Sequence, residues 1–246
     1  MCGIAGYIGC NVNSKDITKA LLRLKRRGTD ATGMAWHAKG HTYVLKSPMK
    51  ADDFLRCGSV KKELSDAVKS PWCLLHTRAA THGDPKNNLN NHPIYNEKGL
   101  IIHNGIVFPE SVLPAQGQTD TEQILLYIQE YGWKGLEKVR GSMAIAYLDF
   151  RTRKIYLYRH FAPMVWANYK GGIAFASAKN ILRVPNCQEL PPDTVFEVDM
   201  KGALRKVAEV KSVANYVTVG GKAVARIGAS YGGAHAHWYE EGVFGY

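Results

Sequence analysis

Short apolar runs bounded by glycine, proline and polar residues recur along this chain, and they limit what it can fold into. Runs of this length and spacing are typical of β-strands. We expect strands at 3–8, 33–36, 42–45, 72–76, 100–103, 143–150, 154–158, 165–169, 173–176, 194–198 and 203–207. Apolar residues at helical spacing are fewer, and they predict helices at 14–27, at 60–68 and from Thr119 onward. Two sheets covered by helices would account for this ratio, so the predicted fold class is α+β.

The length of 246 residues suits one domain with a sizeable core, since 46% of the residues are apolar. We place this domain at residues 2–210. The composition then changes, and residues 211–246, rich in glycine, histidine and aromatic side chains, are expected to form an irregular C-terminal extension of unknown role. No apolar run reaches 18 residues and the first residues do not resemble a signal peptide, so we expect a cytoplasmic protein without membrane contact.

The formal net charge of +11 makes acidic partners such as nucleic acid conceivable. The charge is spread along the chain, however, and its densest cluster, 23–27, falls within a predicted helix. A solvated basic face is therefore favoured over a nucleic-acid site. The five cysteines are scattered without a C-x-x-C pair, which argues against a disulfide framework and a structural zinc site and suits a reducing compartment.

Position 2 is a cysteine, within the opening sequence MCGIAGY. Removal of Met1 would place a thiol and a free α-amine on the same residue. The thiol could then act as a nucleophile, while the amine takes its proton and later returns it to a leaving group. A small buried cysteine at the start of a strand is the alternative, and from these residues alone it is the commoner situation.

Five further segments carry polar residues in an ordered series. They are RGTDATG at 27–33, HTRAATHG at 76–83, NHP at 91–93, HNG at 103–105 and TDTE at 119–122. With Cys2 they closely resemble the class II glutamine amidotransferase domain, in particular its glucosamine-6-phosphate synthase branch, whose arginine segment also runs H-T-R-x-A-T-H-G. The likeness covers about residues 2–200. It implies the fold of the N-terminal nucleophile hydrolases, a four-layer αββα sandwich of two antiparallel sheets.

The resemblance implies that Cys2 attacks the side-chain amide of glutamine. The attacked carbonyl becomes an oxyanion, which needs hydrogen-bond donors where that charge develops. The side chain of Asn104 and the backbone N–H of Gly105 match the family's pair of donors. Asn-Gly between strands also predicts a type I′ hairpin turn, which is the alternative for this pair.

Glutamine also carries a carboxylate and an ammonium group. A carboxylate calls for the planar fork of an arginine, and the resemblance assigns this role to Arg78 with Thr81 and His82. The ammonium group is assigned to Asp120 and to the backbone of Gly105. The alternative for Asp120 is a helix cap in the run TDTE.

Three residues are expected to hold the catalytic and substrate-binding residues in place without contacting the substrate. Arg27 and Gly28 match the family's R-G-x-D segment near the nucleophile, and His92 follows the asparagine-rich loop at 83–91. The spacing of His82, His92 and His103 fits no zinc pattern, and the family uses no metal in this domain, so we expect structural histidines with satisfied hydrogen bonds. The resemblance implies no cofactor.

We therefore predict an enzyme, a stand-alone glutaminase subunit that hydrolyses glutamine through a Cys2 thioester and supplies ammonia to a separate synthetase. A free-standing hydrolase of another γ-glutamyl amide or peptide is the alternative, and a non-catalytic binding module on the same fold is a third reading. One departure from the resembling branch bears on this choice. The bulky aromatic residue that follows its arginine, near the ammonia exit, is Ala79 here.

Overall fold

The computed structural model describes residues 2–210, 216–219 and 222–225. The chain divides into two compact units, Met1–Ser212 and Val213–Tyr246. In the second unit, β14 (Tyr216–Val219) and β15 (Lys222–Ala225) form an antiparallel pair. Most of the expected extension at 211–246 lies outside the described residues, and the predicted site residues all belong to the first unit.

Helices interrupt the strands of the first unit at a few places. Its α-helices are α1 (Ser14–Leu24), α2 (Ala51–Arg56), α3 (Gly58–Ala67), α4 (Asp120–Tyr131) and α5 (Lys179–Leu182), with short 3-10 helices η1 (Asn88–Asn90) and η2 (Trp133–Lys138). At the start of α1, Asn13 and Asp16 each accept a hydrogen bond from the other's backbone N–H, which satisfies donors that the first helical turn leaves free. No helix in the described part of the chain is long and apolar enough to cross a membrane.

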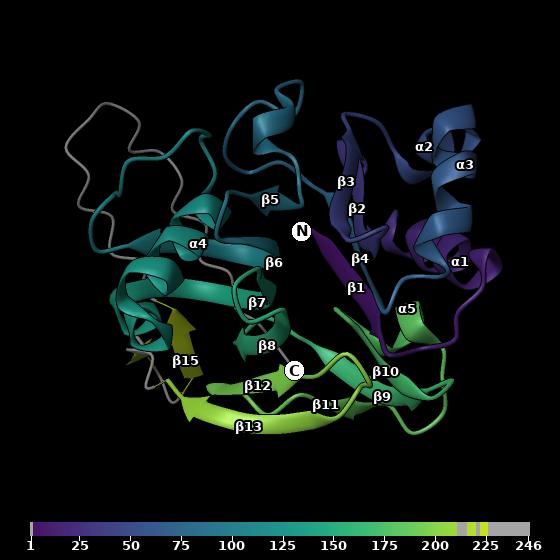
Figure 1. The fold of residues 1–246 in the computed structure, drawn as a ribbon. Coiled ribbons are helices and arrows are strands. Elements are labelled where there is room, and N and C mark those ends of the chain that lie inside the picture. Colours follow the sequence, from purple (N-terminus) through teal and green to yellow (C-terminus); the bar gives the residue numbers. More distant parts are fainter. Residues whose placement is uncertain (1, 211–215, 220–221, 226–246) are drawn as a thin grey trace. The chain divides into compact units, whose positions relative to one another are not determined.

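The strands of the first unit build two antiparallel sheets (Figure 1). Sheet A has the order β11-β9-β10-β1-β4-β2-β3, and sheet B has the order β13-β12-β8-β7-β6-β5. The bounds are β1 (Gly3–Ile8), β2 (Ala31–Ala38), β3 (His41–Ser47), β4 (Trp72–Arg78), β5 (Ile94–Tyr95), β6 (Gly99–Pro109), β7 (Val139–Asp149), β8 (Lys154–His160), β9 (Val165–Tyr169), β10 (Gly172–Ala176), β11 (Gln188–Glu189), β12 (Thr194–Val198) and β13 (Leu204–Glu209). β1 therefore lies in the middle of sheet A, flanked by β10 and β4.

Three separate apolar cores show how the layers stack. The first joins sheet A to α1, α2, α3 and α5, and it includes the buried side chains of Leu21 and Phe54. The second lies between the sheets and includes Ile4 of sheet A and Ile102 of sheet B. The third joins sheet B to α4 and η2. The order is helices, sheet, sheet, helices, so the expected αββα sandwich is confirmed.

The centre of sheet A depends on a close approach at Gly6. A Cβ atom on this residue would lie 2.4 Å from Cε1 of Phe175 and 2.9 Å from Cδ2 of Leu74. Both neighbours are fully buried, so neither can move aside into solvent. The run GIAGYI is thus a central strand in which glycine makes room for the side chains of the strands beside it.

β6 is longer than its apolar run predicts. The strand continues through Asn104-Gly105 to Pro109, so the type I′ turn considered for that pair is wrong. β7 pairs with β6 along its whole length and places Met143 opposite Gly105. Here the pairing of two long strands overrides the local turn preference of Asn-Gly.

The helix boundaries also differ from the sequence pattern. α1 ends at Leu24, so the turn that follows it, and not the helix, carries Arg27. The basic cluster at 23–27 is therefore only partly helical. The pattern does not predict α2, because six residues are too few to show an apolar period, although Asp52 and Asp53 in its first turn suit a helix start.

Replacing Gly6 with alanine should destabilise the protein by about 1–3 kcal/mol, because the added methyl group overpacks a core without free space. Gly58→Ala is the matched control: a Cβ atom there meets nothing within 4 Å at the start of α3, where alanine is the better helix former. Urea denaturation of both variants measures the change. An unfolding free energy of Gly6→Ala equal to that of the wild-type protein would contradict this account of the sheet.

Candidate active site

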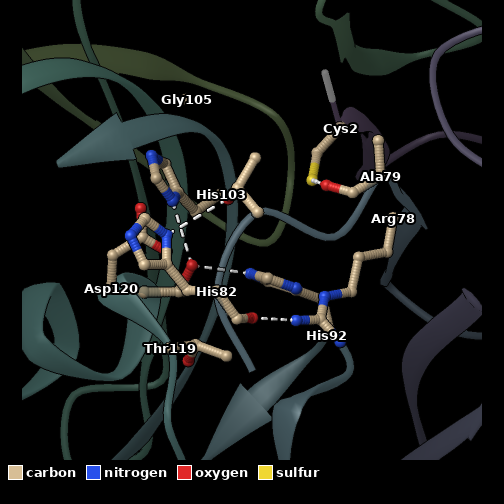
Figure 2. A pocket seen from close by; sticks show the side chains of 11 residues that line it. Cys2, Arg78, Ala79, His82, His92, His103, Gly105, Thr119 and Asp120 are labelled. Carbon is tan, nitrogen blue, oxygen red and sulfur yellow. Dashed lines mark hydrogen bonds between the residues drawn. The ribbon is translucent and has the colours of Figure 1, made fainter. Parts of the chain in front are cut away.

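Cys2 directly precedes β1, at the end of sheet A where β4 also ends, and its side chain lies beside Ala79 (Figure 2). The antiparallel register places Gly3 opposite Thr77, and the chain continues from there to Arg78 and Ala79. The Sγ atom of Cys2 lies 3.5 Å from the carbonyl oxygen of Ala79. Burial raises the pKa of the Cys2 thiol above its ordinary value, and the hydrogen bond to Ala79 opposes this change. The thiol is therefore protonated at neutral pH, and a nearby base is needed to activate it.

Arg27 connects Cys2 to Asn104. Its Nε atom donates to the carbonyl oxygen of Cys2 at 2.9 Å, and its Nη2 atom donates to Oδ1 of Asn104 at 3.5 Å. The side-chain oxygen of Asn104 thus faces Arg27, and the Nδ2 atom of the same Asn104 side chain points away from Arg27. Asn104 is 1% exposed, and its Nδ2 atom has no hydrogen-bond partner among the described residues. A buried donor without an acceptor suits one member of an oxyanion hole.

The other predicted oxyanion donor, the backbone N–H of Gly105, belongs to an edge strand segment of β6. Among the described strands, only the two-residue β5 pairs with this edge of β6. Side chains cap two backbone groups of this edge. Nε2 of His76 donates to the carbonyl oxygen of His103 at 3.1 Å, and Oδ2 of Asp120 accepts from the N–H of Val107 at 3.0 Å. Because alternate residues of a strand direct their N–H groups to the same side, the N–H of Gly105 faces this edge as well. The φ of +147° at Gly105 favours glycine, and a Cβ atom there would collide with the backbone of β7.

Arg78 is 3% exposed and gives its hydrogen bonds to neutral oxygens. Its Nη1 atom donates to Oδ1 of Asn91 at 2.9 Å, and its Nη2 atom donates to the carbonyl oxygens of His82 and, at 2.9 Å, of Gly83. No carboxylate forms an ion pair with it in the part of the chain that the structure describes. A buried cation without a counter-ion is unfavourable, so this position suits a ligand that brings an anion.

Gly28 lets the turn after α1 approach the end of β4. A Cβ atom on Gly28 would lie 2.3 Å from the carbonyl carbon of Arg78. Two residues later, the N–H of Asp30 donates to the carbonyl oxygen of Arg78 at 2.9 Å. The glycine thus positions the turn that carries Arg27 beside the strand that carries Arg78.

Asp120 is the first residue of α4, and the preceding Thr119 is the N-cap, whose side chain accepts from the N–H of Glu122 at 3.3 Å. The helix-cap alternative for Asp120 is therefore wrong. Its carboxylate lies across the pocket from Arg78 and Cys2 (Figure 2). A carboxylate in a pocket wall suits a cationic group of a ligand.

A single pocket brings together most of the predicted site residues. It is lined by Cys2, Arg78, Ala79, Thr81, His82, His92, His103, Gly105, Thr119, Asp120 and Thr121. Thr81 and His82 are exposed, and Oγ1 of Thr81 lies 3.2 Å from Nδ1 of His82. The free volume of about 10 Å³ is close to that of one water molecule.

Three histidines at the pocket, His76, His92 and His103, are buried, and each ring takes part in a hydrogen bond. The Nδ1 atoms of His76 and His92 have no partner among the described residues, so the expected hydrogen bonds are present only in part. Burial lowers the pKa of all three, that of His76 to about 3, so the rings are neutral at pH 7. Sequence patterns do not single out His76 or Thr121, and the only signal for them is their place in the HTRAATHG and TDTE segments. No group of three His, Cys, Asp or Glu side chains within the described ranges could hold a metal ion.

Comparisons with known proteins point to one family. A family model described as a glutamine amidotransferase domain matches residues 67–215, more than half of the chain. The isomerizing glutamine–fructose-6-phosphate aminotransferase of Helicobacter pylori is 31% identical over an alignment of 202 positions, which covers 74% of this chain and 33% of that protein. The protein of the same name from Bacillus licheniformis is 28% identical over 88% of this chain and 39% of its own length. The chain thus spans about a third of the length of the relatives it matches.

Solved structures agree with this match at the level of the fold. The glutamine phosphoribosylpyrophosphate amidotransferase of B. subtilis aligns with 87% of this chain and 50% of its own, with a TM-score of 0.67 and 14% identity. A glutamine aminotransferase class-II domain protein from Silicibacter pomeroyi aligns with 84% of this chain over its whole length, with a TM-score of 0.51 and 18% identity. The expected resemblance is confirmed: the chain belongs to the class II glutamine amidotransferase domain family and has the fold of the N-terminal nucleophile hydrolases.

Proposed function

We propose that this chain hydrolyses the side-chain amide of glutamine, with Cys2 as the nucleophile once Met1 is removed. The observation that carries the proposal is a buried guanidinium that forms no ion pair with a carboxylate of the described residues and lines the same pocket as a thiol and a carboxylate. Arg78 offers the fork that binds a carboxylate, and Asp120 offers the charge that binds an ammonium group. Together they match the two charged groups of an α-amino acid, and its side chain would extend to Cys2.

The first half of the reaction forms a thioester. Sγ of Cys2 attacks the amide carbon of glutamine while the α-amine of Cys2 accepts the thiol proton. The carbonyl oxygen takes up the negative charge, and Nδ2 of Asn104 and the N–H of Gly105 donate hydrogen bonds to it. The amine then passes its proton to the amide nitrogen, the C–N bond breaks, and ammonia leaves.

The second half restores the enzyme. A water molecule attacks the thioester carbon and gives a proton to the same amine, and the same two donors stabilise the second oxyanion. The C–S bond breaks, the amine returns the proton to sulfur, and glutamate leaves. The raised pKa of the Cys2 thiol supports a mechanism in which this amine acts as the base.

Substrate binding exchanges the partners of Arg78. The neutral oxygens of His82, Gly83 and Asn91 give way to the carboxylate of glutamine, which forms the stronger, charge-assisted pair. All three acceptors belong to one loop, 82–91, so this exchange releases the loop and makes room for the rest of the substrate.

The ammonia, in this proposal, passes to an acceptor bound outside these residues, on a separate synthetase. The names of the relatives support this, since aminotransferase describes the transfer of nitrogen to an acceptor.

A second candidate substrate is another γ-glutamyl amide, and Ala79 favours it. The small side chain lines the pocket beside Cys2, so a substituent on the amide nitrogen would meet little obstruction there. Comparing the kcat/KM of glutamine with that of γ-glutamylmethylamide separates the two. Our proposal expects glutamine to be the better substrate, and a higher kcat/KM for the methylamide would select the second candidate instead.

Cys2 should be the residue modified by a diazoketone analogue of glutamine. We expect mass spectrometry to find one adduct per chain, on an N-terminal cysteine from which Met1 is absent, because only this thiol has oxyanion donors beside it. Cys57 and Cys187, which are also partly exposed, provide internal controls within the same sample. Retention of Met1 together with no release of glutamate from glutamine would refute the proposed function.

Replacing Arg78 with methionine should raise the KM for glutamine and lower kcat/KM by about 10- to 150-fold, since a charged hydrogen bond contributes about 1.5–3 kcal/mol. Arg26→Met is the matched control, because Arg26 is exposed and its loss changes the net charge equally. Steady-state glutamate release measures both constants. If both variants lost activity to the same extent, the effect would be one of net charge, and the assigned role of Arg78 would be wrong.

A further inference from the structure

Four buried side chains from four parts of the fold meet at the wall of the pocket, and three of them line it. They are His76 of β4, His92 before β5, His103 of β6 and Thr121 of α4, and none is more than 4% exposed. We call this group the histidine–threonine ring. Oγ1 of Thr121 lies 2.8 Å from Nε2 of His92 and 2.9 Å from Nδ1 of His103. One hydroxyl thus bridges two imidazole rings.

His76 closes the ring. Its Nε2 atom donates to the carbonyl oxygen of His103 at 3.1 Å, and its imidazole stacks on that of His92 with ring centroids 3.9 Å apart. A carbonyl oxygen can only accept, so the proton of neutral His76 is on Nε2. β4 belongs to sheet A and β6 belongs to sheet B, so this hydrogen bond crosses from one sheet to the other.

The crossing joins the two halves of the proposed catalytic apparatus. β4 pairs with β1, and His76 lies opposite Ile4, two residues from Cys2. On the other side, the two oxyanion donors follow His103 directly in β6. The hydrogen bond from His76 to His103 therefore links the strand pair behind the nucleophile to the strand that carries the donors.

Simple packing does not account for this group of side chains. Two of its ring nitrogens, Nδ1 of His76 and Nδ1 of His92, are buried without a hydrogen-bond partner among the residues described. Such groups are unfavourable, and apolar side chains of similar shape would avoid them. The neutral rings do, however, provide directional bonds between four elements, which apolar contacts cannot.

We propose that the histidine–threonine ring is a positioning device that sets the separation between the thiol of Cys2 and the oxyanion donors Asn104 and Gly105. This inference rests on the proposed function. It adds Thr121 and His76 to the residues on which the rate of glutamine hydrolysis depends. These residues act through β6 and not on the reacting atoms. Because the donors act in the transition state, a displacement of about 1 Å can lower the rate up to about 100-fold without weakening substrate binding.

The hydroxyl of Thr121 is the part of the ring that can be removed without changing its shape. Thr121→Val deletes the hydroxyl and keeps a side chain of the same outline, whereas Thr121→Ser keeps the hydroxyl. We expect Thr121→Val to lower the kcat for glutamine hydrolysis about 10- to 100-fold with the KM within about twofold, and Thr121→Ser to retain most of the wild-type kcat. Circular dichroism at the assay temperature establishes that each variant is folded.

The outcomes separate the inference from the proposed function. A wild-type kcat in Thr121→Val, or an equal loss in Thr121→Ser, would overturn the inference and leave glutamine hydrolysis standing. If the wild-type protein releases no glutamate from glutamine, both the inference and the proposed function are wrong. Should Thr121→Val fail to fold, a second pair decides: His76→Gln keeps a donor, whereas His76→Phe keeps a stacking ring without one. The inference requires His76→Phe to lose kcat at constant KM and His76→Gln to keep it.

Discussion

The antiparallel pairing of β1 with β4 is the constraint on which the rest of the site depends. With Gly3 opposite Thr77, the start of the chain emerges beside the end of β4, and Cys2 meets Ala79 there. β1 is the middle strand of its sheet, and all six of its residues are buried. Glycine makes this possible, because a Cβ atom on Gly3 would lie 2.9 Å from the side chain of Leu24. The place of the nucleophile is therefore set by the core and not by a loop.

The oxyanion donors come from the other sheet, so the proposed chemistry depends on how the two sheets are held against each other. Apolar packing between them fixes their distance but is not directional. Direction comes from polar bonds that cross the gap, from Arg27 to Asn104 and from His76 to His103. An uncovered strand edge is ordinarily a liability, and here side chains of His76 and Asp120 cap backbone groups of β6 on either side of Gly105.

Much of the fold could be predicted because short apolar runs bounded by turn-forming residues indicate buried strands, as they do for β1 and β4. The site residues could be assigned because the segments around Cys2, Arg78 and Asp120 resemble a known family in their order. Asn104-Gly105 shows why local patterns can mislead. The pair favours a turn by itself, but pairing with β7, which lies far along the chain, keeps both residues in a strand. Thr121 could not be predicted for the same reason. Its role depends on two histidines that lie 29 and 18 residues away and meet it only in the folded chain.

The loop at 82–91 is held by two cations from neighbouring parts of sheet A. Arg78 binds Oδ1 of Asn91, while Nζ of Lys46 donates to the backbone carbonyl oxygen of the same residue at 2.7 Å. Burial lowers the pKa of Lys46 to about 8, as expected for an ammonium group whose partners are neutral carbonyls. Neutral oxygens compensate a buried charge less well than a carboxylate does, so a substrate carboxylate competes well for Arg78. Lys46 would keep its hold on the backbone of Asn91 during that exchange. In the proposed reaction, recognition of the substrate and release of the loop would be one event at Arg78, while the hydrogen bond from Lys46 holds the backbone of Asn91 independently of Arg78.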